Sequence, residues 1–444
     1  MYFATAFLIV CAACTVLAFV RHPIYGLYFY LAVTYVFPPS RWWGYMFGEE
    51  TRWSLIAAGV TVLAVMFHRG KLRPKPVWLA SVPAMVFAMY TAWMWIQYPW
   101  ALDLEAHLKG SSLYAKYLVA FWFVYRIVDT KDRVRDVLLA HLLGCALLGI
   151  LAYLSGRDGG RLDGVGGPGM DDANTLGMYL ATGAIVGLGL LLTQAGWRRW
   201  LSLGCIVFTM EGLVLTNTRG AFLGLVAGGL VLALYKAKTH RRLFWSLAVV
   251  GLLGFASIID QKFIDRMWTI QDVASESEEA DPSARGRVVL LQAQLRMFVD
   301  HPMGTGHRGT EALSTRYLDK RWLSSHRFDE ERARSSHNTF MTTLVEQGIP
   351  GAALFVWLTL WTLLALLRMR GLEMQHGDPN ITTLAATIVS ALAVIFVTGN
   401  TADFLLAEVQ FWLFATLVSI LQFATMGSTG ANGPSQAARW HAKT

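Results

Sequence analysis

Long stretches of apolar residues constrain this chain more than any other feature of its sequence. A helix needs about 20 residues to cross a bilayer. Thirteen stretches approach that length, and they lie near residues 1–20, 24–39, 53–67, 77–98, 113–128, 137–154, 176–194, 201–216, 220–235, 243–259, 348–367, 381–399 and 404–425. The first two are short and share the break at Arg21-His22-Pro23, so twelve spans fit as well as thirteen. The chain is 55% hydrophobic and only 15% charged, against about 25% charged residues in soluble proteins. We therefore expect an all-α integral membrane protein with about twelve transmembrane helices.

The four cysteines agree with this class. Cys11, Cys14, Cys145 and Cys205 all lie inside apolar stretches, where they are expected to be buried as small hydrophobic side chains. The start of the chain lacks the basic region of a cleaved signal peptide, so we expect residues 1–20 to be retained as the first span.

Positive charge predicts the orientation, because cytoplasmic loops of membrane proteins are enriched in lysine and arginine. Basic clusters occur at 68–75, 131–135, 198–199, 236–242 and 368–370, and they alternate with loops that are neutral, acidic or mixed. We place the basic clusters in the cytoplasm and the other loops on the periplasmic side.

The chain then divides into five parts. Residues 1–150 form N-terminal spans, and residues 151–259 form further spans joined by periplasmic turns. Residues 260–347 form a periplasmic segment, residues 348–425 the C-terminal spans, and residues 426–444 a disordered cytoplasmic tail. Within the periplasmic segment, Val288–Val299 has the pattern of an amphipathic helix, which suits a lid packed on the membrane face.

Arg219 lies on the predicted outer side, in the short turn Thr216-Asn217-Thr218-Arg219-Gly220. An arginine held at the membrane surface by a short turn is costly unless it meets an anion. It either reaches toward lipid phosphates or is a fixed ligand for a phosphorylated lipid. The glycine-rich loop 156–174 carries Arg161 and Asn174. It is either a flexible connector or a phosphate cradle in which Arg161 adds hydrogen-bond donors.

The strongest local pattern is Ser335-Ser336-His337-Asn338, which precedes a short helix that ends at Gly348-Ile349-Pro350-Gly351. Ser336 is the predicted N-cap, which would place His337 in the first helical turn. The positive field of a helix start favours an anion and a neutral imidazole, as a general base requires. Glu346 is nine residues further along and should face away from His337.

Further arginines precede or lie on the lid helix. Arg287 could close over a site from above, and Arg266 is a weaker candidate of the same kind. Asp103-Leu104-Glu105 has the spacing of some divalent-metal sites, but paired carboxylates are common and no other ligand cluster occurs. We expect no metal and no cofactor, with arginines neutralising a leaving pyrophosphate instead.

These segments together resemble the O-antigen ligase superfamily, which also includes O-antigen polymerases and protein O-oligosaccharyltransferases. The resemblance covers roughly residues 155–425. It rests on an ordered set of motifs around one large outer loop: Thr218-Arg219-Gly220-Ala221, then Arg287 with His301-Pro302, Gly304 and Gly306, then His337-Asn338 with Phe340, Glu346 and Gly348. The N-terminal stretch around Pro38-Pro39-Ser40-Arg41-Trp42 is similar to a subgroup often described as O-glycosylation ligases.

The resemblance implies a multi-pass glycosyltransferase of the bacterial inner membrane with a periplasmic active site. The donor would be a glycan on undecaprenyl pyrophosphate, and the acceptor a sugar hydroxyl of lipid A-core. The reaction would be metal-independent and inverting. His337 would act as catalytic base or phosphate binder. The substrate-binding residues would be Arg219, Arg287, Arg161, Asn338, Arg266 and Asn174. Membrane lipids are the other expected partners, and no nucleic acid is expected.

Two alternatives stay open at the level of sequence. A polymerase or a protein O-oligosaccharyltransferase on the same fold would differ only in its acceptor. A transporter for a lipid carrier or glycolipid should place ionisable residues within its spans, whereas here Lys116 and Glu211 are among the few such residues. The sequence does not determine the glycan structure or the oligomeric state.

Overall fold

The computed structural model describes residues 2–48, 51–73, 75–156, 162, 164–167, 169–259, 261, 264, 282–323, 333–376 and 378–429. Every regular element in these ranges is helical, and no strand occurs among them. The helices are α1 (Tyr2–Val20), α2 (Ile24–Val36), α3 (Trp53–Phe67), α4 (Val82–Ile96), α5 (Leu104–Ile127), α6 (Lys131–Ser155), α7 (Ala173–Thr193), α8 (Trp197–Thr216), α9 (Arg219–Tyr235), α10 (Arg241–Ile258), α12 (Pro282–Asp300), α13 (Gly309–Tyr317), α14 (Thr339–His376), α15 (Pro379–Thr398) and α16 (Val409–Thr429). Short 3-10 turns lie at Pro38–Ser40, Gly44–Phe47, Trp78–Ala80, Tyr98–Trp100, Lys238–His240 and Lys320–Trp322.

Each of the thirteen apolar stretches coincides with a helix, so the all-helical class is confirmed. Seven of the described helices are long and apolar enough to cross a membrane: α1, α6, α7, α8, α10, α14 and α15. Helices α3 and α9 and the stretch Val409–Gln422 of α16 are apolar but shorter. The number of twelve spans therefore stays a prediction. Residues 426–429 of the predicted tail belong to α16, and residues 430–444 lie outside the described residues.

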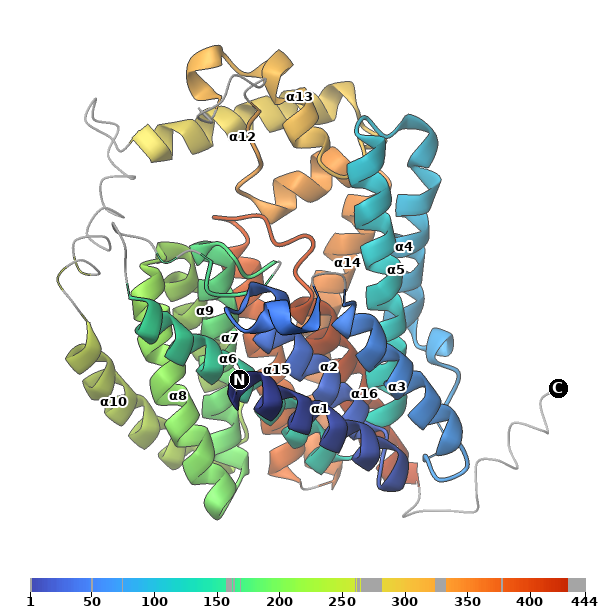
Figure 1. Cartoon of the computed structure of the whole chain (residues 1–444), viewed down its shortest axis with the longest axis vertical. Helices are drawn as coiled ribbons and strands as arrows, with labels where there is room; N and C mark the ends of the chain where they lie inside the picture. The colour runs from blue at the N-terminus through green and yellow to red at the C-terminus, as the bar shows by residue number, and fades with distance from the viewer. Residues whose placement is uncertain are drawn as a thin grey trace.

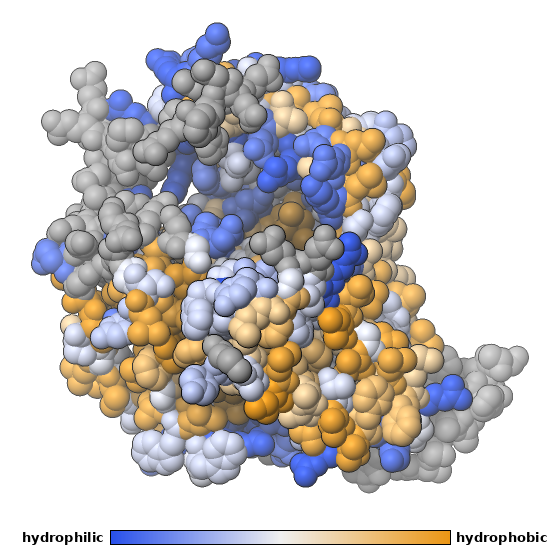
Figure 2. Space-filling view, in the orientation of Figure 1, coloured by the Kyte–Doolittle hydropathy of each residue, from blue (hydrophilic) through white to orange (hydrophobic). Residues whose placement is uncertain are grey.

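The bundle is arranged around α7, which is buried almost throughout, and α15, most of whose residues are buried. Helices α1 and α10 lie at the periphery and expose large apolar side chains, such as Val249, Leu252 and Leu253. Figure 2 shows hydrophobic side chains covering much of the bundle, while hydrophilic ones gather near its upper end. An apolar outer surface of this kind suits a protein surrounded by lipid.

Helices α12 and α13 lie across one end of the bundle, which we call the lid end (Figure 1). Leu290, Ala293 and Met297 form the buried stripe of α12, and they pack with Leu313, Leu318 and Val345. The predicted helix Val288–Val299 is confirmed and extends over Pro282–Asp300. We call α12 and α13 the lid below. That they cover a site as a lid stays a prediction.

Candidate functional site

Three helices begin next to one another at the lid end. Thr218, just before α9, donates its hydroxyl to the carbonyl of Ala173 at the start of α7 (3.1 Å). Thr398, at the end of α15, donates to the carbonyl of Gly220 on α9 (3.3 Å). The backbone N–H of Thr339, the first residue of α14, donates to the carbonyl of Gly399 (2.7 Å). Since helix starts carry unpaired N–H groups and a partial positive charge, this end of the bundle favours anions.

Asn174 lies in the first turn of α7 and is half-buried. Asp172 caps this helix, because its Oδ1 accepts the N–H groups of Asn174 (2.8 Å) and Thr175 (3.2 Å). The glycine-rich loop before it is held in place in part by Arg41, whose Nη1 donates to the carbonyl of Val165 (2.9 Å). Arg161 lies outside the described residues.

Arg219 is the first residue of α9, in a turn between α8 and α9 as predicted, and it is half-buried. Asn217 turns the chain in a left-handed conformation with φ of 54°. Gly220 lies so close to the Thr401 hydroxyl that an added Cβ would meet it at 2.0 Å. The close packing on both sides of Arg219 fixes its Cα at the lid end.

The N-cap of α14 is not the residue that the sequence predicted. Asn338 caps this helix, since its Oδ1 accepts the N–H groups of Phe340 (2.9 Å) and Met341 (3.1 Å). Ser336 is not the cap: its hydroxyl accepts from Gln294 of the lid (2.8 Å) and donates to the Asn338 carbonyl (3.2 Å). His337 therefore lies before the helix rather than in its first turn, and its side chain is exposed.

Its role as the N-cap limits what the Asn338 side chain can offer to a ligand. Its side-chain oxygen is engaged in the cap, so the amide N–H₂ group is what it can present. That group lies 3.5 Å from the carbonyl of Asn400 and the side chain is half-buried. Asn338 is thus both the cap of α14 and a candidate donor beside His337.

Arg287 lies on α12 and is half-buried, whereas Arg285 is exposed. Gln294 follows Arg287 by seven residues, which is about 10.5 Å along the helix and nearly the same face. Because Gln294 bonds Ser336, which adjoins His337, this face of α12 is turned toward the segment that carries His337. Figure 2 shows the surface hollowed between the lid and the bundle, with hydrophilic side chains at its edge. Arg266 lies outside the described residues.

A clip that the sequence did not predict joins the lid to α14. Its residues 301–308 form a loop in which Gly304 and Gly306 have positive φ (86° and 79°). The N–H groups of Thr305 and Gly306 donate to the carbonyl of Glu346 (3.2 and 3.0 Å). Gln97 donates to the carbonyls of Met303 (3.1 Å) and Glu346 (3.0 Å).

Gly348 opens the turn of α14 that receives this clip. Its φ is 63° and its ψ −167°, so α14 is interrupted there, as the Gly-Pro-Gly pattern predicted. An added Cβ would meet the backbone nitrogen of Gly304 at 2.4 Å. Two glycines in the left-handed region therefore pack backbone to backbone, which few other residues permit.

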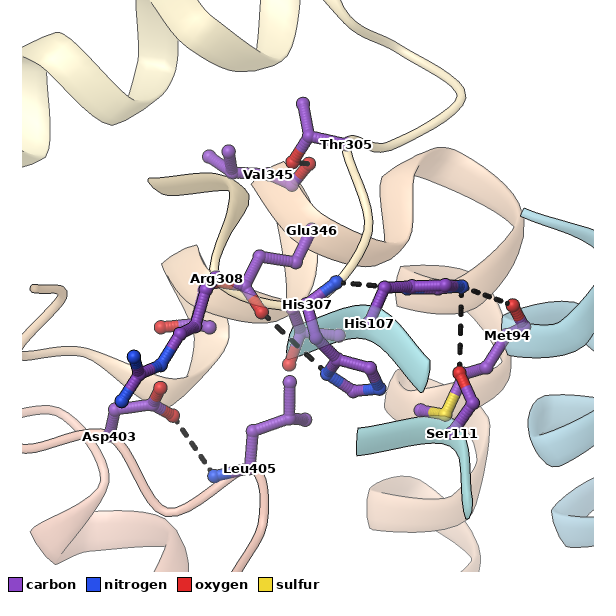
Figure 3. A network of polar contacts seen from close by, with 12 residues as sticks. Met94, His107, Ser111, Thr305, His307, Arg308, Val345, Glu346, Asp403 and Leu405 are labelled. Atoms are coloured by element: carbon purple, nitrogen blue, oxygen red, sulfur yellow. Dashed lines mark hydrogen bonds and ion pairs between the residues drawn. The ribbon is translucent and has the colours of Figure 1, made fainter. Parts of the chain in front are cut away.

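A buried polar cluster forms where the end of the clip, at His307, meets α5 and α14 (Figure 3). His107 accepts the N–H of His307 at Nδ1 (3.1 Å), and its Nε2 lies 2.8 Å from the carbonyl of Met94, to which it must donate. His107 is therefore the neutral Nε2–H tautomer and both its nitrogens are satisfied. Glu346 is buried and accepts the backbone N–H groups of Arg308 and Thr310.

His307 is the unusual member of this cluster. Its ring is only 2% exposed and stacks on Tyr114 (5.9 Å between centroids). Neither ring nitrogen has a hydrogen-bond partner within the described part of the chain, although Nδ1 is 3.8 Å from Glu346 Oε2. Burial lowers the pKa of His307 to about 3, and the nearby His107 contributes in the same direction. The motif residue Glu346 is thus paired with the clip, a contact that no local spacing could indicate.

The Asp103–Glu105 pair has structural partners. Asp103 caps α5 by accepting the N–H of Ala106 (2.9 Å), and Glu105 pairs with Lys109 (2.6 Å). Among the described residues, no group of three or more histidine, cysteine, aspartate or glutamate side chains could hold a metal ion.

The comparison with protein families points to one group. Residues 204–356 match the family described as O-Antigen ligase. The matched region runs from α8 through the lid to the part of α14 after its kink, and it contains Arg219, Arg287, the clip, His337 and Glu346. No curated protein matches the chain.

Proposed function

From the O-antigen ligase match, which supports membership of the O-antigen ligase superfamily, we propose that this protein transfers a glycan from undecaprenyl pyrophosphate to a sugar hydroxyl of lipid A-core. The family supports glycosyl transfer of the ligase or polymerase type in an integral membrane protein. The donor, the acceptor and the stereochemistry are our proposals, as are the inner-membrane location and the periplasmic site.

The convergence of three helix starts beneath the lid carries the proposal. A leaving pyrophosphate needs positive charge that is already in place when the sugar–phosphate bond breaks. Arg219 at the start of α9 and Arg287 on the lid helix α12 belong to this end of the bundle, and we propose that both bind the pyrophosphate. Arg161 and Arg266 are proposed as further ligands of the pyrophosphate, and Asn174 and Asn338 as donors to phosphate or sugar oxygens.

The proposed reaction is a single displacement. The acceptor hydroxyl attacks the anomeric carbon as its proton passes to His337, and a new glycosidic bond forms with inversion. The bond from the anomeric carbon to phosphate oxygen breaks, and undecaprenyl pyrophosphate leaves with the negative charge. No metal is needed in this scheme, because arginines and helix starts supply the positive charge. The exposed His337 can reach a substrate without rearrangement of a buried core.

Glycan transfer in proteoliposomes with EDTA present tests the proposal. The donor is a carrier-pyrophosphate glycan and the acceptor lipid A-core. We expect transfer by the wild type and losses of about 100-fold or more for His337→Ala and Arg219→Ala, in line with the loss of one general base or one charge-stabilising donor. Arg285→Ala on the lid helix α12 and His301→Ala in the clip are matched controls and should stay active. Mutants as active as the wild type would refute the site.

The acceptor is tested separately. A second carrier-linked glycan and a pilin-like protein are offered in place of lipid A-core. Glycosylation of either one, but not of lipid A-core, would identify a polymerase or a protein O-oligosaccharyltransferase on this fold. Substrate movement across the membrane without any glycan transfer would identify a transporter.

A further inference from the structure

A cavity of 870 Å³ lies between α2, α3, α5 and α16, and none of the residues assigned above lines it. Its size is near the upper end of ordinary ligand pockets, about 300–1,000 Å³. The walls are mainly aliphatic and aromatic, including Leu31, Val119, Phe123 and Phe411. An apolar space of this kind is suited to hydrocarbon.

The cavity starts at the lid end. The loop that precedes α3 reaches this end, because Arg41 bonds the carbonyl of Val165 in the segment before α7 (2.9 Å). Arg52 and Trp53 at the start of α3 line the cavity, and so does Thr61, nine residues along the helix. Nine residues of helix span about 14 Å, so the cavity descends several turns into the bundle.

Two cations and one carboxylate line this mainly apolar space. Arg52 and Lys116 are both exposed, and Lys116 interrupts the apolar surface of α5. Glu408 also lines it, but its carboxylate accepts a hydrogen bond from Tyr30. The cavity thus combines an apolar slot with an excess of positive charge. Basic pockets between transmembrane helices recognise anionic lipid head groups.

The cavity and the candidate site share one wall, the loop between α15 and α16. Thr339 binds this loop from the side of the candidate site, through the N–H of Phe404 (2.8 Å) and the carbonyl of Ala402 (3.0 Å). Tyr117, which lines the cavity, donates to the carbonyl of Leu406 (2.6 Å) from the other side. Figure 1 shows α7, α8 and α9 on one side of the bundle and α3, α4 and α5 on the other. A lipid in the cavity would therefore lie beside the candidate site without occupying it.

We propose that this cavity holds hydrocarbon chains of the acceptor lipid, with a phosphate of that lipid bound by Arg52 and Lys116. The assignment rests on the proposed function, which requires two lipid-anchored substrates at one site. The donor pyrophosphate is assigned to the helix starts near Arg219, on the far side of the α15–α16 loop. The cations of the cavity belong to α3 and α5 and are separate from that set.

A substitution that fills the cavity distinguishes binding of the acceptor lipid from a purely structural role of these residues. Ala120→Trp places a large side chain in the cavity, and Ala12→Trp makes the same change on the exposed face of α1. We expect Ala120→Trp to lower transfer to lipid A-core by about tenfold and to leave transfer to delipidated core oligosaccharide unchanged. Ala12→Trp should change neither. Equal losses with both acceptors, or no loss with either, would overturn the proposal.

The two cations are tested in the same assay. Arg52→Ala and Lys116→Ala together should raise the KM for lipid A-core by about 30-fold, since each basic group near a lipid surface contributes about 1 kcal/mol and 1.4 kcal/mol corresponds to a factor of ten. The KM for the donor should not change. Arg52→Lys with Lys116→Arg keeps the charge and should retain the wild-type KM. A rise in donor KM instead would assign the cavity to the donor and contradict the proposal.

Binding without turnover distinguishes this proposal from the proposed function. A photoreactive benzoylphenylalanine replaces Val119, which lines the cavity but is half exposed, or, as a control, the exposed Val16 of α1, in nanodiscs that contain lipid A and phosphatidylglycerol. Preferential crosslinking of lipid A at position 119, lost in the double alanine variant, would support the cavity even if no glycan transfer were found. Equal crosslinking of both lipids at position 119 would show a site for bulk lipid and refute the proposal.

Discussion

At the scale of single residues, glycines determine how the clip meets α14. Gly348 has a φ of 63°, and an added Cβ would lie 2.4 Å from the Gly304 nitrogen. We expect Gly348→Ala to lower the free energy of unfolding by at least about 1–2 kcal/mol, the cost of a left-handed conformation for a residue with a Cβ. Gly59→Ala on α3 is the matched control, because open space surrounds that position. Thermal unfolding in detergent compares the two variants, and equal midpoints would show that the clip is not built as described.

His307 should make stability depend on pH. Its pKa is lowered to about 3 in the folded protein by burial, against 6.5 for an ordinary histidine. Below about pH 6.5 the unfolded chain therefore binds a proton that the folded chain does not bind. Stability should decline as the pH falls from about 6.5 toward 3, and this contribution should be constant above that range.

The groups around His307 are Glu346 at 3.8 Å and the neutral His107. Replacing the imidazole by an amide in His307→Gln removes its titration, so the unfolding midpoint should vary less between pH 4 and pH 7 than in the wild type. His301→Gln, in the same loop but half-buried, should keep the wild-type slope. Identical slopes for His307→Gln and the wild type would contradict the assignment.

At the scale of helices, the sequence was informative where structure is decided locally. All thirteen apolar stretches coincide with helices, and the Gly-Pro-Gly pattern marked the interruption of α14. The predicted N-cap of α14 was wrong. Ser336 and Asn338 are both good N-cap residues, and the choice between them depends on Gln294, which is far away in sequence. The cluster of Gln97, His107, His307 and Glu346 joins four separate segments, so no spacing within one segment could reveal it.

The contact between Gln294 and Ser336 fixes the lid to the segment that carries His337. Gln294 is 1% exposed, and its side-chain amide donates to the Ser336 hydroxyl (2.8 Å). Gln294→Leu removes that bond and leaves the Ser336 hydroxyl with only its two longer bonds to the Asn338 backbone (3.2 and 3.3 Å). We expect a cost of about 0.5–1.5 kcal/mol for one lost hydrogen bond. We expect faster hydrogen exchange at residues 335–338 and lower transfer activity.

Gln292→Leu is the control for this contact, since Gln292 lies two residues away on α12 with its side chain exposed. It should leave both hydrogen exchange and transfer unchanged. If Gln294→Leu exchanges at the wild-type rate, α12 is held by its apolar stripe alone, and His337 is positioned by the cap at Asn338 rather than by the lid.

At the scale of the whole molecule, charge distinguishes the two ends of the bundle. The end opposite the lid carries the basic loops, and several of their cations have acidic partners across helices: Lys131 with Asp378 (2.8 Å) and Arg198 with Asp136 (2.6 Å). Arg69 and Lys71, after the end of α3, are exposed at the same end. From the positive-inside rule we predict that the lid lies outside the cytoplasm, where a hydroxyl acceptor on an exported lipid would be available.

Thiol labelling of intact cells tests this orientation. Met303 of the clip and Arg69 are both exposed, so Met303→Cys and Arg69→Cys should both be reachable from their own side of the membrane. We expect a membrane-impermeant maleimide that has access to the periplasm to label Met303→Cys, and to label Arg69→Cys only after the inner membrane is permeabilised. The native Cys11, Cys145 and Cys205 are buried and should give a low background, which the wild type measures. The reverse pattern would put His337 and Arg219 in the cytoplasm, and a reaction on exported lipid could not then take place at this site.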